Sequence, residues 1–148
     1  MLDKHQKNIA TFIHLSTFSR FFIPFGNFIG PIILWIANKD KSEFIDNHGK
    51  QIINFQISIL LYAIMLGTIT IPFFIFNIFN GFDFINFHGF ESFHINIGKP
   101  SPLLYIGGAL GVLAIIGFII ELALIVIASL KARDGQLYNY PLTINFLK

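Results

Sequence analysis

The chain has 148 residues, of which only 12% are charged and 54% are hydrophobic, whereas a soluble domain usually has about 25% charged residues. Its formal net charge of +2 is too small to predict a nucleic-acid partner, and the absence of cysteine excludes disulfides, thiolate nucleophiles and cysteine metal sites. The composition therefore predicts a single membrane domain over residues 1–148.

Two long segments lack charge almost completely. Residues 51–82 contain no charged side chain, and residues 100–130 contain only Glu121. A hydrocarbon layer about 30 Å thick requires roughly 20 apolar residues in a helix. We therefore predict an all-α integral membrane protein, in contact with the lipid bilayer, with transmembrane helices over 51–79 and 103–132. Pro72 is expected to kink the first of these helices.

The first apolar stretch is interrupted by Arg20, by Pro24 and Gly26, and by Pro31. Proline lacks an amide donor, and glycine permits turns. Residues 8–38 are therefore predicted to form two short helices, about 8–22 and 28–38, joined as a Pro/Gly-broken hairpin. Each helix is about 22 Å long or less, so the hairpin either dips into the membrane or crosses it as two thin, tilted spans.

The remaining segments are polar. Residues 39–50 are predicted to be a loop and helix start, because Asp40 and Glu43 resemble a capping box that would begin a helix near Lys41. Residues 80–102 are predicted to be a loop, in which alternation over 93–97 favours a short extended piece. Residues 133–148 are predicted to lie at the membrane interface, where tyrosines such as Tyr138 and Tyr140 are enriched.

Lysine and arginine set the expected orientation. Residues 39–50 contain Lys39, Lys41 and Lys50, and residues 131–148 contain Lys131, Arg133 and Lys148, whereas the 80–102 loop has only Lys99. By the positive-inside rule, 39–50 and 133–148 are cytoplasmic and 80–102 is extracytoplasmic. Lys4 and Lys7 place the N-terminal end in the cytoplasm as well. Both ends of the hairpin then lie on one side of the membrane, as a Pro/Gly reversal requires.

Glu121 is the main candidate functional residue. It precedes Lys131 by ten residues, or about 15 Å of helix, and an ionisable residue at such a depth is a functional hypothesis by default. Gly107 and Gly111 share its helix face and form a small-residue packing motif. Glu121 is either a proton or ion site or a carboxyl that joins helices, and the second reading is favoured. Arg20 either pairs with Glu121 or snorkels to the interface, and snorkelling is favoured.

Asn54, Ser58 and Tyr62 recur every four residues and therefore line one helix face. In a membrane such groups form hydrogen bonds across helices. We expect them to join helices; a polar lining for a conduction path is the alternative.

The sequence contains no nucleotide-binding, hydrolase or metalloprotease motif. Convergence of His88, Glu91 and His94 on zinc is disfavoured because a fourth ligand is missing. Asp46 and His48 are expected to belong to a solvated, ion-paired loop, and His14 to be a packed histidine. We predict no catalytic residue, no metal and no cofactor.

A further set of residues carries a family resemblance, with its centre over residues 14–56: Pro24, Gly26, Asn27, Gly30, Pro31, Asp46, His48, Gly49, Asn54 and Gln56. In these residues the chain resembles small bacterial membrane proteins of unknown function that are similar to the chloroplast inner-envelope import component Tic-twenty. The resemblance implies a four-helix bundle in the bacterial cytoplasmic (inner) membrane with both termini cytoplasmic. It also implies a translocon-like or accessory role. The family usually has a glutamate where this chain has Gln51.

The leading hypothesis is a non-enzymatic membrane subunit that associates with other membrane proteins or with itself. The alternative is a small channel or proton-linked carrier that uses Glu121 together with Asn54, Ser58 and Tyr62. A membrane enzyme ranks last.

Overall fold

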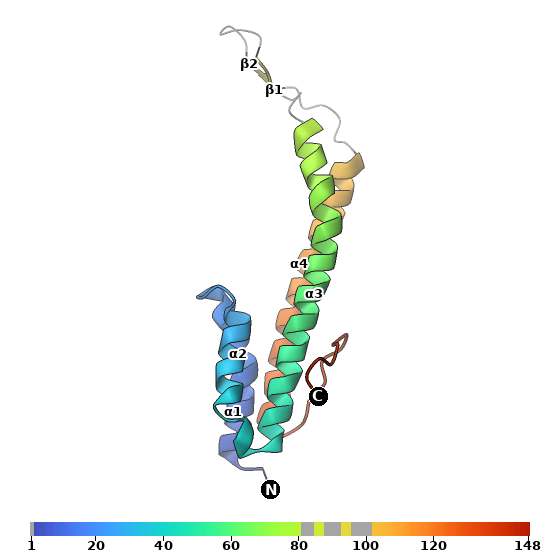
Figure 1. Ribbon diagram of the computed structural model, residues 1–148. Helices are drawn as coiled ribbons and strands as arrows, with labels where there is room; N and C mark the ends of the chain where they lie inside the picture. Colours follow the sequence, from blue (N-terminus) through green and yellow to red (C-terminus); the bar gives the residue numbers. More distant parts are fainter. Residues whose placement is uncertain (1, 81–84, 88–92, 96–101) are drawn as a thin grey trace. The chain divides into compact units, whose positions relative to one another are not determined.

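The structure is a computed structural model that describes residues 2–80, 85–87, 93–95 and 102–148. Its helices are, in chain order, α1 (Lys4–Leu15), the 3-10 helix η1 (Ser16–Phe21), α2 (Gly26–Ile36), the 3-10 helix η2 (Lys39–Lys41), α3 (Glu43–Asn80) and α4 (Pro102–Arg133) (Figure 1). Strands β1 (Ile85–Phe87) and β2 (Phe93–Ile95) pair antiparallel, with Asn86 opposite His94. Apart from this pair, the regular elements of the described residues are all helices, as the sequence predicts.

The chain divides into two compact units. The first comprises Met1–Tyr62 and Ile119–Lys148, and the second comprises Ala63–Phe118. The hydrophobic core belongs to the first unit, where α1, α2 and parts of α3 and α4 pack together with the tail (residues 134–148). Its buried side chains include Ile13, Ile45, Ile52, Phe55, Ile125 and Tyr140.

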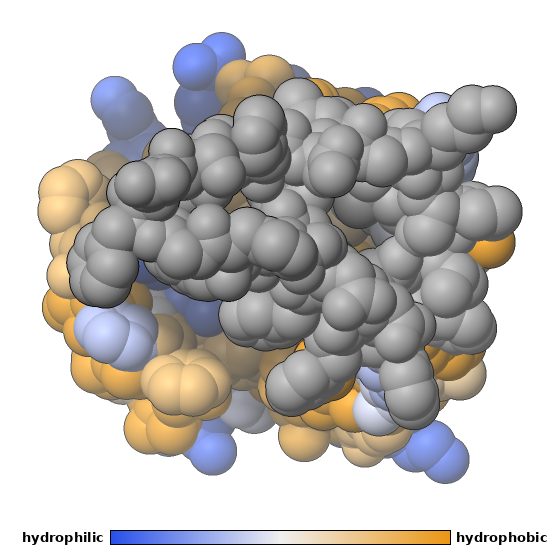
Figure 2. Space-filling view, turned by 90° about the horizontal axis from the view of Figure 1, so that it is seen from above, coloured by the Kyte–Doolittle hydropathy of each residue, from blue (hydrophilic) through white to orange (hydrophobic). Residues whose placement is uncertain are grey.

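Two helical stretches are long and apolar enough to cross a membrane: Glu43–Pro72 in α3 and Tyr105–Arg133 in α4. Large apolar side chains on both are exposed, among them Met65, Ile69, Leu113 and Ile119. In Figure 2, most of the coloured atoms that show around the grey residues belong to hydrophobic residues. Side chains of this kind are compatible with lipid around the helices. Pro72 lies inside α3, which continues to Asn80.

The N-terminal segment differs in detail from the two expected helices. The α-helical part ends at Leu15, and the next turns are 3-10. Ser16, Thr17 and Ser19 each donate a hydroxyl hydrogen bond to the carbonyl three residues earlier. Such bonds compete with the backbone ladder of an α-helix. Hydroxyl groups therefore mark the change of helix type, which the apolar pattern alone does not reveal.

Glycine lets α2 approach η1 closely. A Cβ on Gly26 would lie 2.4 Å from the backbone of Ser19, and a Cβ on Gly30 would lie 2.5 Å from the Ser16 carbonyl oxygen. The Ser19 hydroxyl also lies 2.6 Å from the Gly26 carbonyl oxygen, so its single proton is shared between this carbonyl and that of Ser16. Phe25, with φ of 60°, takes the left-handed conformation that reverses the chain. The predicted break at 23–27 is therefore a tight turn between two elements in contact.

The helix expected to start near Lys41 starts two residues later, and Asp40 is not its cap. Asp40 lies in η2, and α3 begins at Glu43 with extended Ser42 before it. The Phe44 amide donates to the Ser42 hydroxyl at 3.1 Å, as at an N-cap. At the end of α4, Gly135 has φ of 78°. Its amide donates to the Ala132 carbonyl, and the Gln136 amide donates to the Lys131 carbonyl. This Schellman arrangement ends the helix and starts the tail.

Candidate functional site

The centre of the first unit is an ion pair between helices. One guanidinium nitrogen of Arg20 (η1) lies 3.1 Å from Glu121 Oε2 (α4), and the other donates to Glu121 Oε1. The contact is therefore bidentate, which is the strongest geometry for this pair of groups. The side chain of Glu121 is 5% exposed and that of Arg20 is 18% exposed. The pair joins two segments that are 101 residues apart in the sequence.

Two amide side chains complete this polar cluster, which we call the ion-pair network. The Gln56 side-chain oxygen accepts hydrogen bonds from Arg20 at 3.1 Å and from Asn27 at 2.8 Å. The Gln56 amide nitrogen donates to Glu121 Oε1 at 3.2 Å. A buried ion pair is tolerated when hydrogen bonds satisfy its remaining atoms. The network therefore binds η1, α2, α3 and α4 to one another.

This geometry changes the reading of several predicted residues. Arg20 pairs with Glu121, the alternative that the sequence disfavoured, and snorkelling is wrong. Gly107 and Gly111 were expected to share a packed helix face with Glu121, but among the described residues nothing lies within 4 Å of where their Cβ atoms would be. In the sequence, Asn27 and Gln56 stand out only as part of a motif. Their side chains bring the motif into direct contact with the ionisable pair.

A second buried cluster lies on α1, α3 and the tail. The Tyr140 hydroxyl lies 2.9 Å from His14 Nδ1, and His14 Nε2 lies 2.8 Å from His48 Nδ1. All three residues are at most 5% exposed. Each imidazole–imidazole contact requires one nitrogen to donate and the other to accept. The tautomer of one histidine therefore fixes the tautomer of the other, so the three side chains act as one hydrogen-bonded chain.

Burial affects the tyrosine at the end of this chain. It raises the pKa of Tyr140 well above its usual value of 10.0, and nearby Tyr138 and Glu121 raise it further. Burial also raises the pKa of Tyr138. Both phenols are therefore neutral at physiological pH. Tyr140 also stacks on Phe55, with ring centroids 4.1 Å apart, so its ring packs in the core while its hydroxyl belongs to the polar chain.

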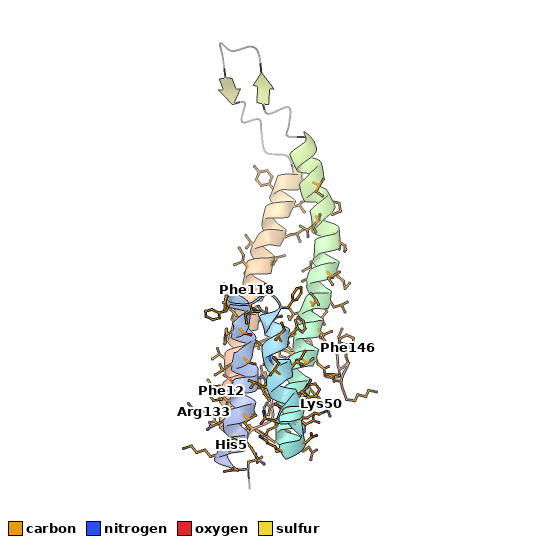
Figure 3. The ribbon with its side chains drawn as sticks, turned by 60° about the vertical axis from the view of Figure 1, so that its left-hand side comes forward. His5, Phe12, Lys50, Phe118, Arg133 and Phe146 are labelled. Carbon is orange, nitrogen blue, oxygen red and sulfur yellow. The ribbon has the colours of Figure 1, made fainter. Side chains whose placement is uncertain are left out.

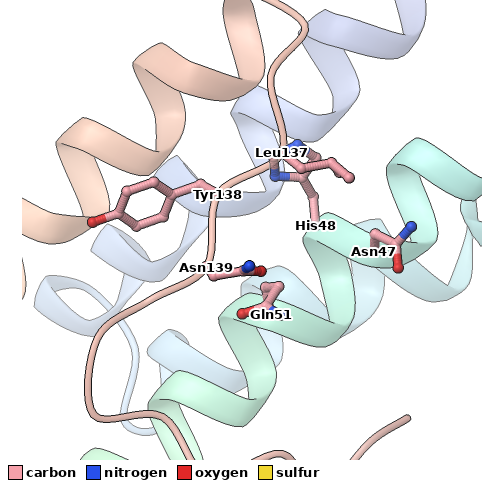
Figure 4. Close-up of a pocket in the computed structure, with 6 residues that line it drawn as sticks. All are labelled: Asn47, His48, Gln51, Leu137, Tyr138 and Asn139. Atoms are coloured by element: carbon pink, nitrogen blue, oxygen red, sulfur yellow. The ribbon is translucent and has the colours of Figure 1, made fainter.

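A small cavity of about 90 Å³ lies beside His48. Its lining comes from α3 and the tail (Figure 4): Asn47, His48, Gln51, Leu137, Tyr138 and Asn139. No hydrogen bond of ordinary geometry reaches the buried His48 Nε2 within the described part of the chain. A polar cavity of this size can hold several water molecules, so hydration can satisfy this nitrogen. The cavity has no charged lining residue among those that the structure describes.

The charged end of α3 is organised around Trp35. The Trp35 indole donates to Asp46 at 2.9 Å, and Lys50 forms an ion pair with the same carboxylate at 2.6 Å. A Cβ on Gly49 would lie 2.0 Å from the Trp35 ring. Gly49 therefore makes room for the ring, and Asp46 orients it. His48 is buried on the same helix and does not belong to a solvated loop, contrary to expectation.

Asn54, Ser58 and Tyr62, which we call the polar ladder, hold the tail. The Asn54 side chain exchanges two hydrogen bonds with the Leu147 backbone, at 3.0 and 2.8 Å. The Ile144 amide donates to the Ser58 hydroxyl, and the Tyr62 hydroxyl donates to the Leu142 carbonyl. The predicted polar face thus contacts an extended segment instead of another helix. It is covered by the tail and does not line an open path.

Sequence reasoning missed the histidine–tyrosine chain. His14 and Tyr140 are 126 residues apart, and no local spacing links them. The available signals were a histidine on an apolar helix face and a tyrosine in a tail that follows the last long helix. The zinc hypothesis for His88, Glu91 and His94 lies largely outside the described residues. Among those that are described, no three His, Cys, Asp or Glu side chains gather as metal ligands would.

The two helices that are long and apolar enough to cross a membrane, and the ion pair that the bundle encloses, are compatible with a helical membrane protein. The chain belongs to the magnetosome magnetite crystal formation protein family (MamF/MmsF), whose model matches residues 5–147. No curated protein and no solved structure matches the chain.

The family match corrects the interpretation drawn from the motif. The resemblance to Tic-twenty is wrong, because the match covers nearly the whole chain and includes the motif residues between 14 and 56. The translocon-like role that depended on this resemblance has no support. The membrane assignment itself remains, because it was made independently from length and hydropathy.

Proposed function

We propose that the protein is a non-enzymatic, multi-pass membrane protein that takes part in magnetite crystal formation. Its family is described by that process. The observation that carries the structural part of the proposal is the closed ion-pair network. Each Glu121 oxygen has a donor within the same chain, so the carboxylate acts in holding the bundle together. The exposed apolar side chains of α3 and α4 remain available to lipid, to other membrane proteins or to further copies of the same chain.

The proposal includes a membrane derived from the cytoplasmic membrane, with both termini cytoplasmic. Figure 3 supports this orientation, because it places His5, Lys50 and Arg133 toward the same end of the first unit. A cluster of cationic ends on one side agrees with the positive-inside rule. The hairpin 8–38 then returns to the side on which it began.

The experiment is a deletion of the gene in its source organism, complemented with the wild-type chain or with variants. Magnetite crystal diameter and number are measured by electron microscopy. Wild type should restore the crystals, whereas Glu121→Leu should not, because it leaves Arg20 without its carboxylate. The charge-exchanged variant Arg20→Glu/Glu121→Arg is the matched control and should restore crystals partly. Crystals unaffected by the deletion would refute the proposed process.

Partners are tested in the same strains. A tagged chain is purified from native membranes in mild detergent, and co-purifying proteins are identified by mass spectrometry against an untagged control. A stoichiometric membrane protein or a homo-oligomer is expected. A strictly monomeric chain without partners would contradict the subunit role while leaving the membrane assignment intact.

The second candidate function is a small proton-linked carrier. The observation that favours it is the hydrogen-bonded chain Tyr140–His14–His48, whose His48 end lies at the cavity. Purified protein in liposomes would then carry a proton flux, measured with an internal pH dye, that Glu121→Gln abolishes. The proposed function, in which Glu121 holds the bundle together, predicts instead that wild-type liposomes carry no proton flux above that of empty liposomes.

A further inference from the structure

The tail follows an unusual path along the first unit. From Gly135 it passes the cavity and the buried Tyr140, and it turns at Pro141 and Leu142, where Leu142 has φ of 58°. It then runs back beside α3 without forming a helix or strand. From this turn onward, three backbone positions bond to the polar ladder: Leu142, Ile144 and Leu147.

The spacing of the polar ladder suits an extended chain. Four residues of helix rise about 6 Å, and two extended residues cover roughly the same distance. The step from Tyr62 to Ser58 accordingly matches the step from Leu142 to Ile144. The next step, from Ser58 to Asn54, takes three tail residues. The Ser58 hydroxyl accepts from the tail while donating to the Asn54 carbonyl at 2.8 Å, so one hydroxyl serves both elements.

The exposed side chains of this segment are apolar except for Asn145. Leu142 is 84% exposed, and Ile144 and Phe146 are 40% and 50% exposed. Figure 3 shows Phe146 on the tail, outside the helices of the first unit. The exposed Leu60 and Leu61 on α3 extend the apolar surface. Charged side chains lie at the other end of this stretch of α3, at Asp46 and Lys50.

The position of the polar ladder on α3 also indicates how deeply the tail segment bound to it lies in the hydrocarbon layer. Tyr62 lies twelve residues beyond Lys50, or about 18 Å along the helix, which is more than half of a hydrocarbon layer about 30 Å thick. Inside that layer, non-helical backbone is tolerated only where protein satisfies its polar groups. The polar ladder supplies such partners for the backbone of Leu142, Ile144 and Leu147. The buried Thr143 hydroxyl has no partner within the described part of the chain.

We propose that residues 142–147 form a re-entrant strap inside the hydrocarbon layer. Lipid acyl chains contact Leu142, Ile144 and Phe146, and the polar ladder binds the backbone on the opposite side. The strap is an interaction surface for lipid and also shields three polar side chains of α3. It differs from an interfacial tail, which would leave the same backbone hydrated.

The absence of native cysteine permits a direct test of depth. Ile144→Cys and Phe146→Cys are labelled with a small fluorophore and reconstituted into phosphatidylcholine vesicles that carry nitroxide either on the acyl chain or on the headgroup. The acyl-chain nitroxide should quench both positions more strongly, and soluble iodide should quench neither. Gln136→Cys, in the exposed first part of the tail, is the control and should show the opposite preference.

A second pair of variants tests the polar ladder. Ser58→Ala should move the Ile144→Cys label toward iodide and headgroup quenching, with loss of the acyl-chain preference. Ser129→Ala, whose hydroxyl bonds to a carbonyl of its own helix, should leave the label where it was. If Ser58→Ala does not give a monodisperse protein, Tyr62→Phe combined with Leu142→Cys provides the same comparison with the loss of one hydroxyl.

Two results would overturn the proposal. Headgroup or iodide quenching of Ile144→Cys in the otherwise wild-type chain would place the segment at the interface. A disulfide-linked dimer of unlabelled Ile144→Cys, together with absent acyl-chain quenching, would show a second copy on this surface. Both outcomes leave the ion-pair network and the proposed function unaffected, because neither depends on the strap.

Discussion

At the scale of single residues, burying the Arg20–Glu121 ion pair has a large free-energy cost of desolvation. Two opposite charges in contact enter a low-dielectric region together, whereas either alone is strongly disfavoured. Gln56 contributes both an acceptor and a donor, so it matches the two members of the pair at once. Removing one charge should therefore cost more than removing both.

A double-mutant cycle measures this difference. Arg20→Met alone and Glu121→Leu alone should each lower the free energy of unfolding by about 3–5 kcal/mol, the usual cost of leaving one buried charge unpaired. The variant with both changes should lose clearly less than the sum. Reversible unfolding in detergent, followed by circular dichroism, gives the four values. Strict additivity would contradict the pairing.

Tyr140 makes stability depend on alkaline pH. Because burial raises its folded-state pKa above the usual 10.0, the folded chain holds the phenol proton more tightly than the unfolded chain does. This contribution is complete below pH 10 and is lost as the pH rises from there through the folded-state pKa. Tyr140→Phe, which also removes the bond to His14, should cost about 1–3 kcal/mol at neutral pH.

The advantage of wild type over Tyr140→Phe should shrink as the pH rises above about 10. Thermal unfolding of both proteins between neutral and alkaline pH checks this. Tyr62→Phe is the control, since that phenol belongs to the polar ladder and lies outside the histidine chain. A wild-type advantage that does not change with pH would show that Tyr140 ionises freely.

At the scale of elements, glycine decides how closely α2 and η1 pack. Gly26 and Gly30 are one helical turn apart and both face the backbone or hydroxyl of η1. The small side of α2 therefore meets the serine-rich side of η1, a contact common between membrane helices. The same spacing in α4, at Gly107 and Gly111, meets open space among the described residues. The same glycine spacing is therefore packed against another helix in the first unit and faces open space among the described residues in the second.

Alanine substitution separates these environments. Gly26→Ala should lower the melting temperature substantially, because the new methyl group meets backbone at 2.4 Å, and overpacking typically costs about 1–3 kcal/mol. Gly111→Ala is the matched control and should be neutral or slightly stabilising, since alanine favours helix over glycine by about 1 kcal/mol. Differential scanning fluorimetry gives both values. A destabilised Gly111→Ala chain would reveal a packed partner at that face.

The two long apolar helices, the break in the first apolar stretch and the membrane class follow from the sequence, because they depend on hydropathy and on Pro and Gly, which act locally. The 3-10 helix η1 does not, because it depends on hydroxyl bonds to the backbone. The candidate site follows only in part. Glu121 stands out since it is the one charge in a long apolar run, but its pairing with Arg20 depends on the hairpin fold. The polar ladder is visible as a spacing, whereas its partner is an extended backbone with no side-chain pattern to recognise. Ser42 replaces Asp40 as the helix cap because the chain first forms the short η2.

At the scale of the molecule, the topology has two requirements. The proposed orientation requires the loop between α3 and α4 to be extracytoplasmic, and it requires the hairpin to return to its starting side. Both follow if α3 and α4 each cross the membrane once. The cavity and the charged residues near Lys50 then belong to the cytoplasmic half of the protein, and the polar ladder extends from there past the middle of the hydrocarbon layer.

Single cysteines report this topology in intact cells. A membrane-impermeant maleimide should label Ser92→Cys, in the 80–102 loop, from outside after permeabilisation of any outer membrane. Lys39→Cys and Asp134→Cys should react only once the cytoplasmic membrane is opened. Labelling of Lys39→Cys from outside would invert the proposed orientation.

The long sequence distance between Arg20 and Glu121 also constrains biosynthesis. At a translation rate of about 5–20 residues per second, the carboxylate is made roughly 5–20 s after the guanidinium. During that interval a lone arginine must avoid the hydrocarbon layer. The first hairpin therefore waits at the membrane surface or within the insertion machinery until α4 emerges. Arrival of the last helix commits the whole chain to the bilayer, so truncated chains that lack α4 are expected to be cleared by membrane proteases.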